Sequence, residues 1–211
     1  MRLGKGNRIL PYSVLVGPLE IGDDNVIGPH AVLGSEPQNT RDRWTPSTGR
    51  VVIGNRNVIR EFTGVHKPVL AAETRIGDRC FLMHTTHVAH DCVLQDDVTL
   101  TTLSGISGHT VMLRGVTMAA SATSHQHSVV GHFSMVGMGA QLQKNLPPFA
   151  RYVPRSPLSV NEYAIEKFGF QEHEPEIREY VLRRTRPTTP LLLAIVEEFE
   201  RHHLASGRDS F

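Results

Sequence analysis

The stretch LMHTTHVAHDCVLQDDVTLTTLSGISGHTVM, residues 82–112, repeats one pattern every six residues. Counted in sixes as far as residue 142, ten of eleven positions are aliphatic or methionine: Leu82, Val88, Leu94, Leu100, Ile106, Met112, Met118, Ser124, Val130, Val136 and Leu142. The fourth residue after each of these is nearly always small. The same register occurs earlier in the chain, at Ile9, Leu15, Ile21, Ile27, Leu33, Ile53, Ile59, Val65 and Ile76.

Neither the period of an α-helix nor strict alternation explains a period of six. A solenoid does, because each hexapeptide can form one short strand and one corner. Three hexapeptides then make one triangular coil, and coils stack about 4.8 Å apart. An ordinary β-sandwich does not keep such a register for this long. The sequence therefore predicts an all-β solenoid, a parallel β-helix with its aliphatic side chains inside.

Two segments interrupt the repeat, and a third segment ends it. Residues 35–51 and 67–75 are predicted to be loops that leave a coil, where binding and catalytic residues often lie. Beyond LPPF (146–149) the composition shifts to helical periodicity in EYAIEKF, EIREYVLRRTR and TPLLLAIVEEFERHH. We expect a β-helix over 1–150 and a C-terminal α-helical region over 151–211.

Charge and composition exclude several classes of protein. Lys+Arg number 22 and Asp+Glu 21, so the charges nearly balance. The sequence has no basic stripe of the kind that binds nucleic acid. The sequence contains no apolar run of about 18 residues, which a membrane-spanning helix would need. The start MRLGKGNRIL has no signal-peptide pattern. The two cysteines form no C-x-x-C motif and are typical of a reducing compartment. These features predict a cytoplasmic protein.

The histidines gather in one part of the repeat, with seven of the twelve between His84 and His132. In HVAHDC (87–92) the repeat turns Val88 and Cys92 inward, so His90 lies on the outer side. Adding one coil of three hexapeptides takes His87 to Gly105 and His90 to Gly108. The stacked residues lack side chains, which predicts free space and backbone N–H groups beside both imidazoles.

The register also predicts a column of Asp91, His109 and His127, each one coil after the last. A zinc site needs three or four ligands at about 2.0–2.1 Å. His84, His87 and His90 recur every three residues, so we expect them on different faces of a three-sided coil. A histidine beside a carboxylate suits general-base catalysis near neutral pH. The spacing favours a base, and leaves open a zinc site that His109 or His127 shares with a neighbouring subunit.

Several motifs together resemble one enzyme family: IGNRNVIREFTGVH (53–66), HVAHDC (87–92), LSGISGH (103–109), SHQH (124–127), LPPF (146–149), VN (160–161) and EKFGF (166–170). In order and spacing the sequence is similar to the UDP-N-acetylglucosamine O-acyltransferases, which catalyse the first step of lipid A synthesis. The resemblance implies a left-handed parallel β-helix, against the usual right-handed crossover rule. It also implies a homotrimer with active sites between adjacent subunits.

The resemblance assigns catalytic roles to three residues. His90 would be the general base that takes the proton from the 3-hydroxyl of the sugar as it attacks the thioester of an acyl-acyl carrier protein. Asp91 would orient and polarise His90, which requires the corner to bend the two side chains together. The N–H of Gly108 would stabilise the oxyanion. No metal and no resident cofactor is implied, because phosphopantetheine on the carrier protein holds the acyl group.

The resemblance also assigns substrate-binding roles, with departures. The family residues lining the sugar-nucleotide and acyl cleft correspond to His66, His87, His109, His125 and Gln126. Asn161 corresponds to a nucleotide contact, and Lys167 alone remains of the basic residues before the closing Gly-Phe. Asn39 replaces a sugar-binding Asp, and Arg41 replaces a Lys. Met138 stands where a glycine often floors the acyl channel, which predicts a shorter acyl chain.

Three alternatives to this activity follow from the same residues. The protein could be a related acyltransferase for a different nucleotide sugar or an amine, a trimeric zinc lyase of the γ-carbonic anhydrase type, or a binding solenoid that has lost catalysis. A basic patch on a predicted helix would suit docking of an acidic carrier protein: Arg178, Arg183, Arg184 and Arg186.

Overall fold

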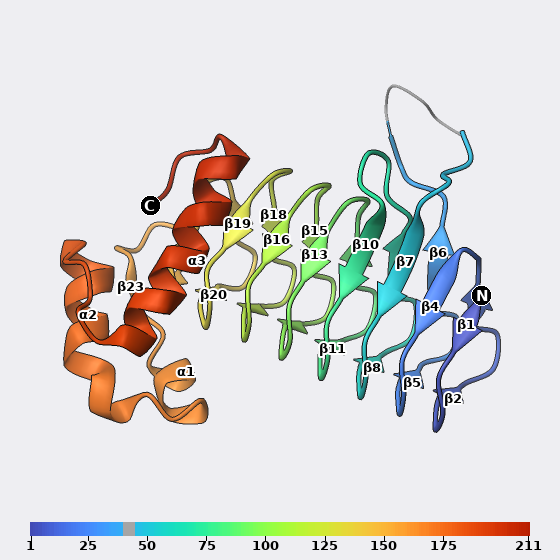
Figure 1. Cartoon of the computed structure of the whole chain (residues 1–211), viewed down its shortest axis with the longest axis horizontal. Helices are drawn as coiled ribbons and strands as arrows, with labels where there is room; N and C mark the ends of the chain where they lie inside the picture. The colour runs from blue at the N-terminus through green and yellow to red at the C-terminus, as the bar shows by residue number, and fades with distance from the viewer. Residues whose placement is uncertain (40–44) are drawn as a thin grey trace.

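In this computed structural model the chain is a three-sided parallel β-helix followed by three α-helices (Figure 1). The structure describes residues 1–39 and 45–211. The predicted site residue Arg41 lies outside the described residues. The N-terminus lies at one end of the row of coils, and the helices cover the other end.

Short strands stack into three faces. The first face consists of β1 (Arg2–Leu3), β4 (Leu19–Ile21), β7 (Arg50–Ile53), β10 (Glu73–Ile76), β13 (Val93–Leu94), β16 (Val111–Met112) and β19 (Val129–Val130). The second consists of β2 (Arg8–Ile9), β5 (Val26–Ile27), β8 (Val58–Ile59), β11 (Phe81–Leu82), β14 (Thr99–Leu100), β17 (Thr117–Met118), β20 (Met135–Val136), β22 (Ala150–Tyr152) and β23 (Ser159–Val160). The third consists of β3 (Val14–Leu15), β6 (Val32–Ser35), β9 (Gly64–His66), β12 (His87–Val88), β15 (Gly105–Ile106), β18 (Thr123–Ser124) and β21 (Gln141–Leu142).

The strands pair in the register that the repeat predicts. Ile21 pairs with Ile53, Ile53 with Ile76, and Ile76 with Leu94. The last pair is one regular coil apart, and the longer steps before it contain the two loops, which do not displace the next strand. In the first coil, Ile9 is 42% exposed and Leu15 is half-buried. From Ile21 onward the predicted inward positions are buried, and Leu82, Val88 and Leu94 are fully inaccessible. This confirms the predicted prism of aliphatic side chains.

Both loops leave the prism at the same edge, where the third face turns into the first. We call this the loop edge. In the following coils the same edge carries Asp91, His109 and His127, whose φ angles are 59°, 61° and 61°. Positive φ is uncommon for residues other than glycine, and here it belongs to the corner turn. The predicted column is confirmed, because the rings of His109 and His127 stack with centroids 4.3 Å apart.

The C-terminal region caps the prism. Its helical elements are α1 (Glu162–Lys167), the 3₁₀ turn η1 (Gln171–His173), α2 (Glu174–Arg183) and α3 (Pro190–Ser206). Phe170 lies between Phe133 and Phe149, with ring centroids 4.9 and 5.0 Å away, and closes the end of the core. On α3, Phe199 packs with Val129 and Leu113 against the first face. Among the described residues no helix is long and apolar enough to span a membrane.

Candidate active site

His90 and Asp91 form a hydrogen-bonded pair at the loop edge. The distance from His90 Nδ1 to Asp91 Oδ2 is 2.7 Å. Side chains of adjacent residues point apart in an extended strand. Here the left-handed φ of 59° at Asp91 bends the chain, so that the two side chains meet. The structure thus has the corner geometry that the pairing requires.

The Asp91 carboxylate is anchored from the second loop. Oδ1 accepts the N–H groups of Leu70 and Ala71 at 2.9 and 2.6 Å, and Oδ2 accepts that of Val69 at 3.0 Å. The carboxylate is only 1% exposed, although it lies outside the prism. Burial opposes its ionisation, but the hydrogen bonds from Ala71, His90, Val69 and Leu70 outweigh burial and hold the pKa of Asp91 below its ordinary value. Asp91 is therefore a fixed negative charge.

This charge decides which nitrogen of His90 carries the proton. An ionised carboxylate only accepts hydrogen bonds, so Nδ1 of His90 donates and Nε2 keeps its lone pair. A Cβ placed on Gly108 would lie 2.5 Å from Cε1 and 2.7 Å from Nε2 of His90. The predicted gap at Gly108 thus exists, and the imidazole itself occupies it. The Gly108 N–H has no hydrogen-bond partner within the described part of the chain.

The His90 ring borders a hollow of about 340 Å³ on the third face, which we call the histidine hollow. Its lining includes Gln38, His66, His87, Ala89, His90, Gly105, Ile106, Ser107, Gly108, Thr123 and Gln126. His87 on strand β12 and His90 at the corner border this one hollow. His84, His87 and His90 nevertheless do not share one face, as expected. His84 lies elsewhere, beside Thr85 and Phe62.

Two further histidines of this hollow, His87 and His66, are held in their neutral form by burial. Burial lowers the pKa of His87 to about 4, and the charges of His66 and His90 add to the effect. Burial also lowers the pKa of His66. Nδ1 of His66 is 2.9 Å from the carbonyl oxygen of Glu36 and must donate to it, so Nε2 is an acceptor. Glu36 also pairs with buried Lys67 at 2.7 Å, which ties the two loops together.

The column of Asp91, His109 and His127 adjoins the His90–Asp91 pair, so its side chains could in principle bind a metal ion. His90, Asp91 and His109 are the one group of potential ligands that converges within the described residues. Nε2 of His109 is 3.6 Å from Asp91 Oδ2, too far for a hydrogen bond. Both carboxylate oxygens already accept hydrogen bonds from the second loop, so a metal would have to displace these donors. The donor set fits a base and its orienting carboxylate better than a zinc site.

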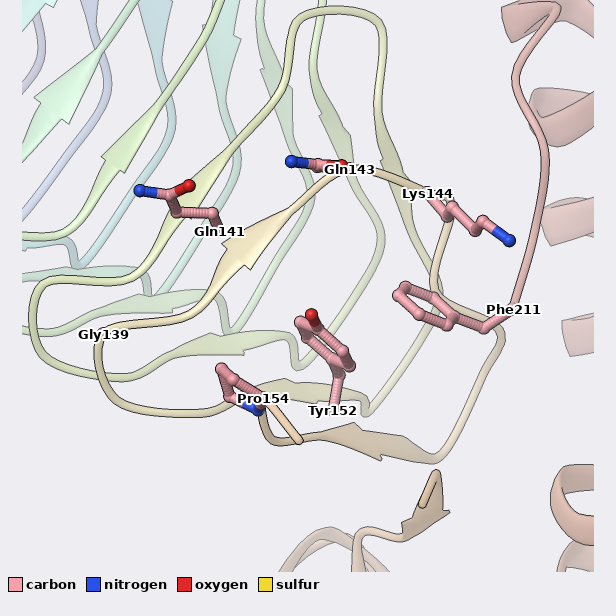
Figure 2. A pocket seen from close by; sticks show the side chains of 7 residues that line it. All are labelled: Gly139, Gln141, Gln143, Lys144, Tyr152, Pro154 and Phe211. Atoms are coloured by element: carbon pink, nitrogen blue, oxygen red, sulfur yellow. The ribbon is translucent and has the colours of Figure 1, made fainter. Parts of the chain in front are cut away.

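Two neighbouring hollows continue along the third face. A hollow of about 310 Å³, the glutamine hollow, shares Ser107, Thr123 and Gln126 with the histidine hollow and also includes His125. Beyond it lies the tail pocket of about 430 Å³ (Figure 2), which shares Gln141 and Gln143 with the glutamine hollow. Its other lining residues are Gly139, Lys144, Tyr152, Pro154 and Phe211. The three hollows share lining residues and make one trough along the coils, with both polar and apolar walls.

The remaining predicted binding residues lie outside this trough. Asn161 is buried at the start of α1 and donates to the carbonyl oxygen of Phe133 at 2.8 Å, so it holds the fold together. Lys167 is exposed on α1 and stacks over Tyr163 and Phe168. Met138 is 75% exposed at a corner beside Gly139. Asn39 lines a separate hollow between the two loops.

Some residues of the trough were not among the predicted site residues. Thr123 and Gln141 follow His87 and Gly105 in paired steps of one coil, so the register could have found them. The N–H groups of residues 69–71 carry no such signal. The basic patch on α2 and beyond is largely neutralised, because Arg178, Arg183 and Arg186 all pair with glutamates.

Known proteins share the hexapeptide repeat and the fold. Residues 1–35 match the family described as bacterial transferase hexapeptide (six repeats), which places the chain in the class of hexapeptide-repeat proteins. The chain is 32% identical to the acyl-(acyl-carrier-protein)–UDP-N-acetylglucosamine O-acyltransferase of Synechocystis sp., over 87% of this chain and 67% of that protein. It is 33% identical to the enzyme of the same name from Gloeothece citriformis, over 76% of this chain and 59% of that protein. The chain belongs to the UDP-N-acetylglucosamine O-acyltransferase family.

Solved structures agree on the fold. The UDP-N-acetylglucosamine acyltransferase from Bacteroides fragilis superposes with a TM-score of 0.87 over 100% of this chain and 95% of that one, at 20% identity. The enzyme from Campylobacter jejuni gives 0.79 over 96% and 78%, at 23% identity. The fold is thus the predicted left-handed parallel β-helix. The chain spans 59% and 67% of the length of the relatives from Gloeothece citriformis and Synechocystis.

Proposed function

We propose that the protein transfers an acyl chain, 3-hydroxylated in its natural donor, from acyl carrier protein to the 3-position of a UDP-linked N-acetylglucosamine-type sugar. This reaction is the first step of lipid A synthesis. The observation that carries the proposal is the Asp91–His90 pair, whose 2.7 Å hydrogen bond leaves the lone pair of Nε2 beside the histidine hollow. The names of the relatives supply the substrates.

In the proposed mechanism His90 Nε2 takes the proton of the sugar hydroxyl as its oxygen attacks the thioester carbonyl. The new C–O ester bond forms and the C–S bond breaks. The proton then passes from His90 to the thiolate of phosphopantetheine, which leaves as a thiol. Asp91 stays ionised throughout, because its hydrogen bonds hold its pKa low. The reaction needs no resident cofactor, since the carrier protein brings the activated acyl group.

The N–H of Gly108 is the proposed oxyanion donor. No described hydrogen bond uses this N–H, and the His90 ring packs against the Cα of Gly108 where a side chain would begin. A donor aimed at the developing charge contributes about 10²–10³-fold in rate. The neutral rings of His66 and His87, with the amide of Gln126, then line the space for the sugar and the thioester.

The proposed active form is a homotrimer in the cytoplasm. The histidine hollow is open on one side, which suits a second subunit completing it. Cys80 and Cys92 are free and buried, as expected in a reducing compartment. Light scattering on the purified protein gives the oligomeric state, and a monomer with full activity would contradict the shared site.

Acyl transfer by purified protein tests the activity. UDP-N-acetylglucosamine and its 3-amino analogue should be compared as acceptors, with 3-hydroxyacyl carrier protein as the donor. His90→Ala should lower the rate by about 10²–10⁴-fold. The matched control is His84→Ala, which removes an imidazole that lies away from the hollow. A His90→Ala rate within tenfold of the wild type would refute the base.

Met138 is proposed to limit the acyl chain. Its exposed side chain stands beside Gly139, which lines the tail pocket at the far end of the trough. Met138→Gly should shift the preference of the enzyme toward longer donors. A series of donors of increasing length measures this, and an unchanged preference would remove the assignment.

A further inference from the structure

The last residues of the described chain are docked on the β-helix. We call residues 207–211 the tail. The backbone of Asn145 donates to the carbonyl oxygen of Asp209 at 2.8 Å and accepts the N–H of Phe211 at 3.1 Å. The Asn145 side chain is fully buried and donates to His203 and Ser206 at the end of α3. The tail is therefore held in a defined position at the far end of the trough.

This docking brings Arg208 to the wall of the glutamine hollow. Nη1 of Arg208 is 3.0 Å from Nδ1 of His125 and 3.2 Å from the carbonyl oxygen of Gln126. Nη2 donates to the carbonyl oxygen of Gln143. All three acceptors are neutral, and Nε of Arg208 is buried without a partner in the described structure. No carboxylate in the described residues pairs with this guanidinium.

The contact fixes the tautomer of His125. A guanidinium has five N–H donors and no acceptor. Nδ1 of His125 also lies 3.1 Å from the carbonyl oxygen of Gln126, a contact that favours a proton on Nδ1. The charged guanidinium of Arg208 at 3.0 Å makes the stronger hydrogen bond, so Nδ1 accepts from Arg208 and the ring proton lies on Nε2. An imidazole held in this form offers an N–H donor, and the arginine behind it adds positive charge. His125 lines the glutamine hollow beside amides and hydroxyls from Gln126, Gln141 and Thr123, and Arg208 contacts His125 from behind.

We propose that Arg208 is a positioning residue of the substrate trough, which holds His125 as an Nε2–H donor for the diphosphate of the nucleotide sugar. The identity of this ligand rests on the proposed function. The residues expected to hold the nucleotide lie elsewhere, because the basic residue Lys167 stacks on α1 and the amide of Asn161 is buried in the fold. Arg208 provides a positive charge at the trough itself.

Nuclear magnetic resonance tests the tautomer without any substrate. In the ¹⁵N-histidine-labelled full chain at pH 8, His125 should show Nε2 protonated and Nδ1 bare, and His125→Asn identifies its signals. In Arg208→Gln the signals should move toward a mixture of both tautomers. Arg201→Gln is the control, because it removes one exposed positive charge from α3 and has no described side-chain hydrogen bond. An unchanged tautomer in Arg208→Gln would overturn the proposal.

Kinetics tests the role in binding. Arg208→Gln should raise KM for the UDP-sugar about tenfold, the effect of one lost hydrogen bond to a bound ligand, with kcat within about twofold. Arg208→Lys should recover only part of this, because a lysine lacks the forked donors. Arg201→Gln should match the wild type. Unchanged KM in Arg208→Gln, with only a lower melting temperature, would overturn the proposal. If the wild type transfers no acyl group, the proposed function fails, and the tautomer measurement still decides the role of Arg208.

Discussion

Asp91→Asn separates the orienting role of the carboxylate from its bulk. The wild-type side chain accepts four hydrogen bonds, from the N–H groups of residues 69–71 and from His90. An asparagine keeps one oxygen, which serves Leu70 and Ala71. Its NH₂ group then faces the N–H of Val69 and Nδ1 of His90. Because NH₂ can only donate, His90 must turn its lone pair to Nδ1 and carry its proton on Nε2.

The expected losses follow from these contacts. A general base in the wrong tautomer costs about 10³–10⁴-fold in kcat, as for other histidine–aspartate pairs. The substitution also removes the acceptor for Val69 and the charge that strengthened the other bonds. Hydrogen bonds to charged groups contribute about 1.5–3 kcal/mol each, so the free energy of unfolding should fall by about 2–4 kcal/mol.

Acyl-transfer rates and urea unfolding of Asp91→Asn measure both losses. KM for either substrate should change little, because Asp91 is buried behind His90. Asp96→Asn is the matched control, since the Asp96 carboxylate is 43% exposed and lies away from the hollows of the trough. The reasoning is refuted if Asp91→Asn keeps kcat within tenfold of the wild type while its fold is intact.

Three further predictions concern the site and the tail. Gly108→Ala places a methyl group 2.5 Å from the His90 ring, so kcat should fall by at least about 100-fold. Gly105→Ala is the control, because its methyl group meets His87 at 3.7 Å and should lower kcat far less. Equal losses of kcat in the two variants would contradict the close approach of His90 to Gly108. His87 is neutral in the fold because burial lowers its pKa from 6.5 to about 4, so its contribution to stability is lost as the pH falls through this window. Urea unfolding against pH should give a flatter slope in His87→Gln than in the wild type. Asn145→Ala should lower the free energy of unfolding by about 2–4 kcal/mol, because its side chain makes hydrogen bonds with Val129, His203 and Ser206. Thermal melts check this, and a melt like that of the wild type would show that the end of α3 is held by other contacts.

The prism could be predicted from the sequence because its constraint is local and periodic. Each inward side chain meets residues one coil above and below, so the same kind of residue recurs every six positions. Leu82, Val88 and Leu94 are buried for this reason. The stacking of His109 on His127 follows from the same one-coil step. The C-terminal helices were predicted from a different period, which appears after the repeat ends.

The site was predictable only where it follows the repeat or resembles a known family. The register placed Gly108 beside His90, and the resemblance suggested the pairing with Asp91. The hydrogen bonds that hold Asp91 come from backbone N–H groups of the second loop, which any residue except proline would supply. Arg208 reaches His125 from 83 residues away through the fold of the tail. Asn161 was predicted to bind nucleotide, whereas the structure places it in the interior.

The loop edge has a consequence for how such a protein can change. Two inserts of very different length leave the prism at that edge, yet the next strand resumes in step with the one before. Insertions and deletions are therefore tolerated at the corner that carries His90 and Asp91. A single residue gained within a strand would instead turn every later aliphatic side chain toward water. Selection can thus remodel what the protein recognises by altering the length of chain at one corner, while the scaffold that positions the His90 imidazole stays the same.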